Sequence, residues 1–408
     1  MKKTSFTRLS QKPSVVIANY VLLTFYGYFS IGLTLAVLPI FIHQQLGFNT
    51  VIAGAVISIQ YVMTFIMRAY AGHIVDSKGP KPAVIASMSC FLLTGLLLIA
   101  SFSLADRPLL SLSMLVLSRL TTGCGEGMVG ASPVNWAMLR TGEEHTATAI
   151  SYNGIANYSS MAIGAPLGVW MASDLGNWSL GVLTMMAGLI GLFSALKKPA
   201  LKSGQDAPRK PFLKVLSAVS PYGSGLALAG IGFGTLSTFI TLYYAFNKWN
   251  QAAICITAFS LFFVLGRLLF ARGIHRFGGI QVAIVCMAVE SLGLLLLWLA
   301  GDPHMAVLGA SFTGLGFSLV FPALGVEAVS RASASNKGAA LGAYGLFIDI
   351  SLGITGPLVG LVAKGLGMNY IFPFSMSMVI IGLIVCLILK EKAREEVKSI
   401  IDLSADKA

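Results

Sequence analysis

Charged residues are scarce in this chain. Asp, Glu, Lys and Arg make up 11% of its 408 residues, whereas hydrophobic residues make up 56%. A soluble protein of this length needs far more charge on its surface, so the composition excludes a soluble enzyme or binding domain. The fold class must therefore be sought among membrane proteins.

The sequence also lacks the common catalytic and energy-coupling motifs. It contains no GxxxxGKS/T phosphate loop, no HExxH and no GxSxG. Their absence argues against ATP-driven transport without a partner subunit, zinc-protease chemistry and serine-hydrolase chemistry. The five His have no metal-ligand spacing, and the five Cys lie in apolar runs where packing is their ordinary role. We expect no metal, no cofactor, no disulfide framework and no enzymatic activity.

Apolar runs of membrane-spanning length follow one another along the chain. A helix crosses the roughly 30 Å hydrocarbon core with about 20 residues. We predict an all-α membrane protein with twelve transmembrane helices in two pseudo-symmetric six-helix bundles. The runs lie at about 15–41, 51–71, 82–104, 109–134, 147–171, 177–196, 217–245, 252–272, 279–300, 304–329, 338–363 and 368–389.

A Pro- and Lys-rich stretch from Lys197 to Lys214 divides these runs into six and six. Its composition is typical of a solvated linker. The predicted domains are an N-terminal bundle (1–196), a cytoplasmic linker (197–216), a C-terminal bundle (217–390) and a cytoplasmic tail (391–408).

The basic residues predict the orientation in the membrane. With a cytoplasmic N-terminus, most of the 28 Lys and Arg lie in inside segments, and only Arg107, Lys248 and Lys364 lie in outside segments. This asymmetry follows the positive-inside rule, so both termini are expected in the cytoplasm. The net charge of +12 then reflects topology rather than nucleic-acid binding, because no basic stretch is interleaved with aromatic residues.

Two distant segments repeat one pattern, in which an Arg near the end of an apolar run precedes a charged turn and a Gly. They are RAYAGHIVDSKGPK from Arg68 and RLLFARGIHRFGGI from Arg267. We expect both Arg side chains to snorkel to the membrane interface. Duplicated membrane halves are found mainly in transporters. Further repeat pairs at a nearly constant offset are Tyr152 with Tyr344, Asn157 with Asp349, Gly164 with Gly356, Gly168 with Gly360, and Pro133 with Pro322.

Three motifs resemble those of a known family, the major facilitator superfamily. The loop after run two resembles the family's signature loop, run four its Arg motif, and run five its antiporter motif. The stretch DISLGITGPLVG, from Asp349 to Gly360, is similar to an arabinose-efflux-permease-like, YhhS/YfcJ-type branch of exporters. The motif residues are Gly72, Asp76, Gly79 and Lys81 in the loop, Arg119, Gly123 and Gly125 in run four, and Gly164, Pro166 and Gly168 in run five.

The resemblance implies a monomeric carrier in the bacterial inner membrane. Asp76 and Lys81 would pair as a latch for the outward-facing conformation, the alternative being a solvated turn charge. His275 stands where the second hairpin would repeat Asp76, so the two halves are not equivalent gates. A fuller Gly-Pro motif lies in run eleven. The expected helix hinges are Gly164, Pro166 and Gly168 in run five, and Gly356, Pro357 and Gly360 in run eleven.

Three charged residues near the middle of the membrane are candidates for proton coupling. Asp349 carries a carboxylate that burial discharges, so it can exchange a proton or hold a cationic or hydrogen-bonding substrate, but not both. Arg119 and Glu126 lie two helical turns apart on one face and are too distant for direct contact. The alternative for each is a permanent structural ion pair. Glu290 and Glu327 are weaker candidates.

The central cavity should draw on runs one, four, seven and ten. A polar or amphipathic organic solute suits its predicted lining of Tyr and amide side chains, although each could equally serve helix packing. The candidate substrate residues are Tyr26, Gln60, Asn153, Asn157, Tyr243, Tyr244 and Tyr344.

The sequence therefore predicts a secondary transporter whose partners are a small molecule, protons and the lipid bilayer. The leading prediction is a proton-coupled antiporter that exports a small organic solute or drug by alternating access. One alternative is a proton-coupled symporter that imports a sugar or organic acid. A different class is an intramembrane enzyme or a non-transporting membrane sensor. The loop motif and the central charges argue against a sensor.

Overall fold

The computed structural model describes residues 12–201, 212–270, 272–330 and 337–405, and these ranges are almost entirely helical. Residues 202–211 of the predicted linker at 197–216 lie outside them, and its last residues, from Phe212, belong to a helix. The elements of the N-terminal half are α1 (Pro13–Leu35), α2 (Leu38–Ile40), the π-helical η1 (Phe41–Gln45), α3 (Thr50–Lys78), α4 (Pro80–Ser103), α5 (Pro108–Val129), α6 (Ser132–Thr141), η2 (Glu143–His145), α7 (Thr146–Asp174) and α8 (Trp178–Lys197). Those of the C-terminal half are α9 (Phe212–Phe246), α10 (Ala253–Phe270), α11 (Arg272–Phe277), α12 (Gly279–Trp298), α13 (Pro303–Phe317), α14 (Val320–Ser330), α15 (Lys337–Gly365), η4 (Met368–Tyr370) and α16 (Ile371–Ala405).

These elements form twelve membrane-length segments, because several segments consist of consecutive shorter helices. Within the described residues, 10 segments are long and apolar enough to span a membrane by length and composition. The α5–α6 segment and α7 complete the twelve, and they carry Arg119, Glu126, Asn153 and Asn157. The predicted fold class is confirmed.

Segments four and ten are interrupted at corresponding places, whereas the hydropathy pattern predicts each as one continuous run. The helix stops after Val129 and restarts at Ser132, and in the C-terminal half it stops after Phe317 and restarts at Val320. Pro133 and Pro322 lie just after the two breaks. A proline has no N–H to donate and clashes with the preceding turn, so each break follows from a residue that the repeat had already paired.

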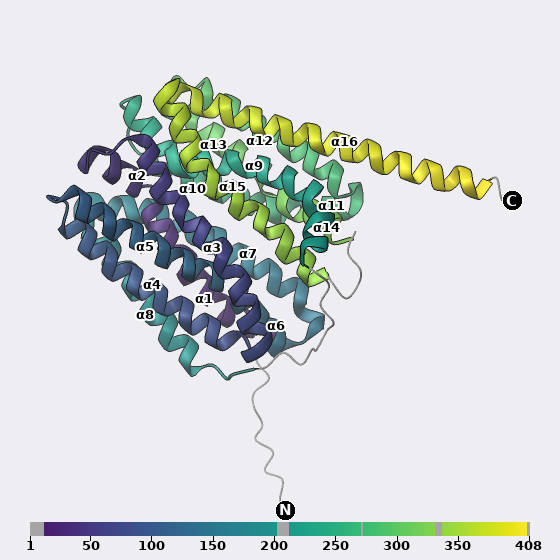
Figure 1. The fold of residues 1–408 in the computed structure, drawn as a ribbon, viewed down its shortest axis with the longest axis horizontal. Helices are drawn as coiled ribbons and strands as arrows, with labels where there is room; N and C mark the ends of the chain where they lie inside the picture. Colours follow the sequence, from purple (N-terminus) through teal and green to yellow (C-terminus); the bar gives the residue numbers. More distant parts are fainter. Residues whose placement is uncertain (1–11, 202–211, 271, 331–336, 406–408) are drawn as a thin grey trace, which may run out of the picture.

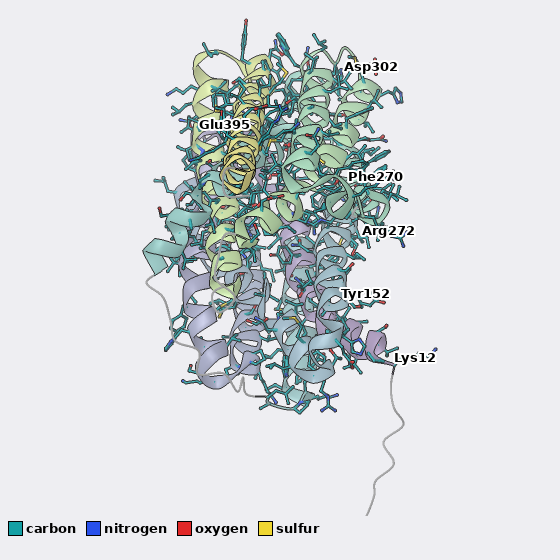
Figure 2. The ribbon with its side chains drawn as sticks, turned by 90° about the vertical axis from the view of Figure 1, so that its right-hand side faces the viewer. Lys12, Tyr152, Phe270, Arg272, Asp302 and Glu395 are labelled. Atoms are coloured by element: carbon teal, nitrogen blue, oxygen red, sulfur yellow. The ribbon has the colours of Figure 1, made fainter. Side chains whose placement is uncertain are left out.

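The two halves lie side by side as separate bundles (Figure 1), and Figure 2 shows the C-terminal half above the N-terminal half. Successive long segments run antiparallel, so one end of the molecule holds the start of α1, the turn between α3 and α4, the end of α8 and the start of α9. We call this the linker end and the opposite end the distal end. Helix α16 projects beyond the bundle at the linker end (Figure 1).

The first and seventh segments are the most buried of the 10 that are long and apolar enough to span a membrane. Over a membrane-length stretch of each, 78% and 89% of the residues are buried inside the protein, against 67% in the tenth segment and 50% or less in the others. The first and seventh segments therefore line the centre of the molecule, as predicted, and the twelfth, at 33%, is the most exposed to the surroundings.

The repeated hairpins share their turn geometry. The turn after α3 is a single residue, Gly79, at φ 86°, and the turn before α12 is Gly278 at φ 84°. Only glycine adopts this left-handed region without strain. The sequence repeat that begins at Arg68 and Arg267 is thus also a repeat of backbone structure.

Two seams join the halves. The first seam is the contact between α3 and α15, and the second seam is the contact between α7 and α10. In the first seam, Thr50 donates to Gly360 O at 3.3 Å, and Ser58 donates to Leu352 O at 3.2 Å. In the second seam, Thr257 donates to Ala162 O at 3.4 Å.

The first seam is tight toward the distal end, whereas glycines of its two helices nearer the linker end have no close described neighbour. A Cβ added at Gly54 would lie 2.3 Å from the Gly356 oxygen, so the two backbones touch there. Nearer the linker end, a Cβ added at Gly72 of α3 or at Gly342 of α15 would meet nothing within 4 Å among the described residues. The halves are therefore closed against each other at the distal end.

Candidate functional site

An ion pair crosses the first seam where its tight part ends. Arg68 on α3 donates from Nη2 to Oδ1 of Asp349 on α15 at 3.0 Å, and its Nε faces Oδ2 of the same carboxylate. The Asp349 side chain is 2% exposed and that of Arg68 is 29% exposed. A two-point guanidinium–carboxylate contact of this kind is strong and fixes geometry. The prediction that Arg68 snorkels to the interface is wrong, because the carboxylate gives its charge a partner within the protein.

Polar groups from three further helices gather beside Arg68. Gly130, at the end of α5, leaves room for them: a Cβ there would lie 3.4 Å from the Tyr28 hydroxyl and 3.6 Å from Arg68 Nη1. Asn153 of α7 donates to Gly130 O at 3.2 Å and accepts from Thr24 of α1 at 2.7 Å. This central cluster thus joins four helices of the N-terminal half to the carboxylate of the C-terminal half.

Arg119 and Glu126 belong to a second network within the N-terminal half. Gln60 lies between them: its Oε1 accepts from Arg119 Nη1 at 3.1 Å, and its Nε2 donates to Glu126 Oε2 at 2.8 Å. Thr34 accepts from Arg119 at 3.3 Å, and Thr64 donates to Glu126 at 3.0 Å. The two charged groups therefore make no direct contact, and the Gln60 amide links them through one hydrogen bond to each.

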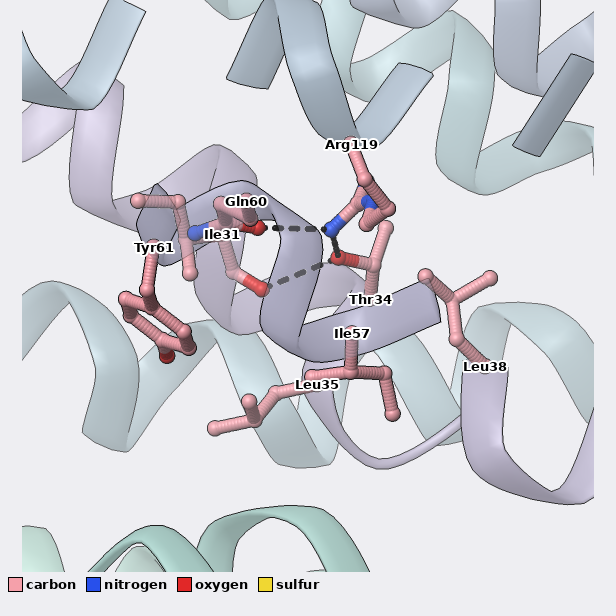
Figure 3. Close-up of a pocket in the computed structure, with 8 residues that line it drawn as sticks. All are labelled: Ile31, Thr34, Leu35, Leu38, Ile57, Gln60, Tyr61 and Arg119. Atoms are coloured by element: carbon pink, nitrogen blue, oxygen red, sulfur yellow. Dashed lines mark hydrogen bonds between the residues drawn. The ribbon is translucent and has the colours of Figure 1, made fainter. Parts of the chain in front are cut away.

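Arg119 also borders a small pocket (Figure 3). The pocket lies between Thr34, Gln60, Tyr61 and Arg119, and its volume of about 10 Å³ suits roughly one water molecule. Arg119 Nη2 is buried without a hydrogen-bond partner among the described residues. The guanidinium keeps one donor available in the interior.

Glycines on α5 allow the network to form. A Cβ at Gly123 would lie 2.2 Å from Gln60 O, and a Cβ at Gly127 would lie 2.8 Å from Thr64 O. Small residues at such places let two membrane helices approach closely. The Arg motif of run four thus supplies both a charge and the contact surface that positions its partners.

Arg267, the repeat counterpart of Arg68, lies at the second seam. Its Nε donates to Ser318 O at 3.0 Å, and its guanidinium carbon lies 4.8 Å from the Phe263 ring centre and 5.5 Å from that of Tyr158. The two rings stack at 3.6 Å. Snorkelling is wrong for Arg267 as well, because its head group lies between the halves. Asn157, the counterpart of Asp349, has a buried Oδ1 with no partner in the described part of the chain.

The hairpin residues occupy the linker end. Lys81 donates to Leu196 O at 2.9 Å and to Lys198 O at 2.7 Å, at the C-terminal end of α8. A cation there meets the unsatisfied carbonyls and the negative end of the helix dipole. Lys81 thus has partners other than the expected carboxylate. Asp76 and His275 lie on α3 and α11, but their side chains are outside the described part of the structure.

The two Gly-Pro motifs have different neighbours. Gly168 packs within its own half, where a Cβ would lie 2.0 Å from Leu33 O. Gly356 and Gly360 pack across the first seam, against Gly54 and Thr50. Pro166 and Pro357 lie inside α7 and α15 without ending them, and Gly164 packs against α1 beside Gly168.

Four predicted substrate residues lie away from the central cluster. The Tyr243 hydroxyl donates to Leu297 O at 3.1 Å, and the Tyr244 hydroxyl donates to Pro303 O at 3.2 Å, both near the distal end of the C-terminal half. Tyr344 donates to Phe321 O at 3.0 Å. Tyr26 lies against α8, 3.5 Å from a Cβ placed on Gly191. Gln60, Asn153 and Asn157 remain at or near the centre.

The two weaker acidic candidates differ in environment. Glu327 accepts from Gly279 N at 2.9 Å and so caps the start of α12. Glu290 is fully buried against Gly232, and neither of its carboxylate oxygens has a partner among the described residues. Glu327 has a structural explanation in this arrangement, whereas Glu290 has none.

Comparison with known proteins agrees with this architecture. The family model described as Major Facilitator Superfamily matches residues 20–250 and 222–403, which together cover most of the chain. The chain belongs to the major facilitator superfamily. An uncharacterised MFS-type transporter of Pseudomonas aeruginosa is 49% identical over 386 residues, 94% of this chain and 95% of the relative. One from Burkholderia mallei is 46% identical over 87% of each chain.

Solved structures of this superfamily share the fold. The nucleoside transporter NupG superposes with a TM-score of 0.70 at 15% identity, over 91% of this chain and 98% of that one. A POT family transporter superposes with a TM-score of 0.72 at 13% identity, over 92% and 96%. The protein is thus a multi-pass membrane transporter with the major facilitator fold.

Sequence reasoning missed Arg68 as a site residue, together with Tyr28, Ser58 and Tyr158. The sequence did contain a pattern that pointed to Arg68. Arg68 and Arg267 repeat each other, and Asp349 and Asn157 repeat each other, so a pairing between the two sets was open to inference. Nothing in the sequence marks Tyr28 or Ser58 apart from other polar residues in apolar runs.

Proposed function

We propose that this transporter is a proton-coupled antiporter that exports a small organic solute by alternating access. The ion pair between Arg68 and Asp349 carries the proposal. It joins the two halves across a seam that must open and close during transport, and one member is a buried group that a proton discharges.

Protonation of Asp349 weakens the first seam at the Arg68–Asp349 pair, where the tight part of the seam ends. The contact with Arg68 needs the carboxylate form, since a neutral acid loses the Coulomb attraction that offsets the burial of both charges. With the pair broken, the distal contacts at Ser58 and Gly356 remain as the weaker hold on the closed seam. Proton binding therefore favours separation of the halves at the distal end.

The conformation fits the substrate-loading stage of this cycle. The halves are closed at the distal end, and the pair is intact. With both termini in the cytoplasm, as the basic residues predict, the linker end faces the cytoplasm. An exporter takes up its solute from that side after its proton has left.

Other residues take supporting roles in the proposal. Glu126 and Arg119, joined by Gln60, form a charged network next to the central cluster. This network rearranges its hydrogen bonds when Arg68 is released from Asp349. Asn153 and Asn157 contact the solute. Asp76, Gly72 and Gly79 belong to the latch that favours the outward-facing conformation, with Lys81 anchored on α8. In this proposal the protein belongs to the arabinose-efflux-permease-like branch. It works as a monomer in the bacterial inner membrane.

Reconstitution into proteoliposomes tests the coupling. A pH gradient is imposed with an acidic lumen, compounds are added outside, and lumenal pH is followed with a dye. Antiport predicts alkalinisation of the lumen on addition of a transported compound, and Asp349→Asn abolishes it while the variant still purifies as a folded protein. Unchanged proton movement in that variant would remove Asp349 from the coupling mechanism.

A second candidate is proton-coupled symport that imports an organic acid. The observation that favours it is Arg267, which offers a positive charge at the second seam without a carboxylate partner in the described residues. The electrical signature separates the two. Symport of one proton with a monovalent anion moves no net charge, whereas exchange of the same anion for a proton moves two charges and responds to membrane voltage.

A further inference from the structure

The two seams present the same cation with different partners. Arg68 meets Asp349 across the first seam. Arg267 stands at the repeat position and faces α7 across the second seam, where the place of the aspartate is taken by Asn157. A guanidinium inside a membrane protein pairs with an opposite charge or with backbone carbonyls, and such residues mark substrate and ion pathways.

The contacts of Arg267 leave one side of its head group free. Nε is occupied by Ser318 O, and the rings of Phe263 and Tyr158 flank the guanidinium. Within the described ranges, neither Nη1 nor Nη2 has a hydrogen-bond or ion-pair partner. These two nitrogens form the outer fork that binds a carboxylate with two parallel hydrogen bonds.

Asn157 lies one helical turn along α7 from the point that Arg267 contacts. A Cβ on Gly154 would lie 2.8 Å from Arg267 Nη1. Asn157 is three residues further along α7, and side chains at that spacing share a face with Cβ atoms about 5–6 Å apart. Its Oδ1 is buried and unpartnered in the described structure. A small molecule that binds the fork therefore also meets an amide that lacks a partner.

We propose that Arg267 and Asn157 form a binding site for the carboxylate of an organic anion, which the transporter carries as substrate. The bound carboxylate takes the place that Asp349 occupies at the other seam. A donor group next to it, such as a hydroxyl, satisfies Asn157 Oδ1. This inference rests on the proposed transport function and specifies the chemical class of its substrate.

The site also explains how proton and substrate act on one conformational change. Protonation of Asp349 loosens the first seam, whereas a bound anion at Arg267 adds a contact at the second. Each ligand thus biases a different seam of the same pair of halves. A ligand shifts such an equilibrium only if its contacts differ between the two conformations. The proton on Asp349 and the anion at Arg267 each meet this condition, because each changes a contact that exists only while its seam is closed.

Thermal unfolding of the purified protein tests the site with size-matched probes. The acids are benzoate, lactate and succinate, their neutral counterparts are benzamide, lactamide and succinamide, and benzylamine is the cation. At least one acid is expected to raise the melting temperature while its amide does not. Arg267→Gln should weaken that acid about tenfold or more, since the charge-assisted fork is lost.

Two further variants keep the test decisive. Asn157→Asp supplies an internal carboxylate and should exclude the acid by occupying the fork, while Arg267→Lys preserves charge and fold but not the fork. Arg272→Gln is the matched control, because Arg272 is an exposed Arg of the same half (Figure 2). It should bind as the unaltered protein does.

Several outcomes overturn the proposal. These are equal binding of an acid to Arg267→Gln, equal binding of amides or benzylamine to the unaltered protein, and no binding by any of the three acids. The proteoliposome assay separates this from the proposed function. Acid binding through Arg267 without proton movement retains the site and rejects coupling, whereas proton movement that is independent of Arg267 retains coupling and rejects the site.

Discussion

The two seams of this transporter start from one repeated pattern and differ in a single charge. Each places an Arg from the second helix of one half opposite the fifth helix of the other half. At the first seam the opposite helix supplies Asp349, and at the second it supplies Asn157. The first seam is thus neutralised from within the chain, and the second has a cation that no described carboxylate compensates.

This difference indicates a division of labour between the halves. A site that a proton discharges must contain its own carboxylate, whereas a site that receives an anion must not. Duplication yields two similar seams, and one substitution, Asp or Asn, decides between these tasks. The following experiments test that comparison, from the largest expected effect to the smallest.

Removal of Arg68 should have the largest effect. Arg68→Gln leaves the buried Asp349 carboxylate without its cation, and breaking one partner of a buried pair costs about 3–5 kcal/mol. We expect a lower melting temperature and loss of proton-driven transport. The exchanged pair Arg68→Asp with Asp349→Arg should recover part of the stability, and failure of both the single and double variants to differ from the unaltered protein would contradict the role of the pair.

Widening the first seam should have the next largest effect. Gly356→Leu places a side chain where a Cβ alone would lie 2.2 Å from Gly54 O, and overpacking of this kind costs about 1–3 kcal/mol. Because the clash falls on the distal contact, the variant should favour the conformation that is open at the distal end. Accessibility of single cysteines at that end to a membrane-impermeant thiol reagent measures the shift. Gly342→Leu on the same helix, where a Cβ would touch no described atom within 4 Å, should leave accessibility unchanged.

Making the seams alike should favour the closed distal end. Asn157→Asp gives the second seam the same charge pair as the first and so stabilises the closed distal arrangement. An added contact of about 1.4 kcal/mol changes the equilibrium between conformations about tenfold. Without substrate, the accessibility of single cysteines at the distal end should therefore fall by roughly that factor. Asn157→Ala, which adds no charge, serves as the control in this substrate-free measurement. Greater distal accessibility in the Asp variant would argue that the two residues do not face each other.

The smallest effect is expected at the linker end. Lys81→Gln removes the cation from the α8 C-terminus, where such contacts are worth about 0.3–1 kcal/mol. Turnover should change by no more than a few-fold, and substrate binding should be retained. Lys197→Gln, an exposed neighbour, is the comparison, and complete loss of transport in Lys81→Gln alone would show that Lys81 takes part in more than helix capping.

Individual residues show how far the sequence could predict the site. Gln60 was expected as a substrate contact, and the structure places it as the link between Arg119 and Glu126, which α3 and α5 bring together through Gly123. Tyr243 and Tyr244 lie in a central segment, but their hydroxyls are satisfied within their own half. Membership in a central helix follows from order along the chain, whereas the direction of a side chain depends on rotation of the helix against its neighbours.

The sequence by itself determined the membrane class, the twelve segments, the duplicated halves and the paired positions of Arg68 with Arg267 and Asp349 with Asn157. These follow from hydropathy, length and repetition, which are local properties of the chain. Only the tertiary structure decided that Arg68 meets Asp349, that Arg267 meets a carbonyl and two aromatic rings, and at which end the halves close. Such contacts join residues far apart in sequence across helices of similar composition, so their energies depend on packing and charge in three dimensions.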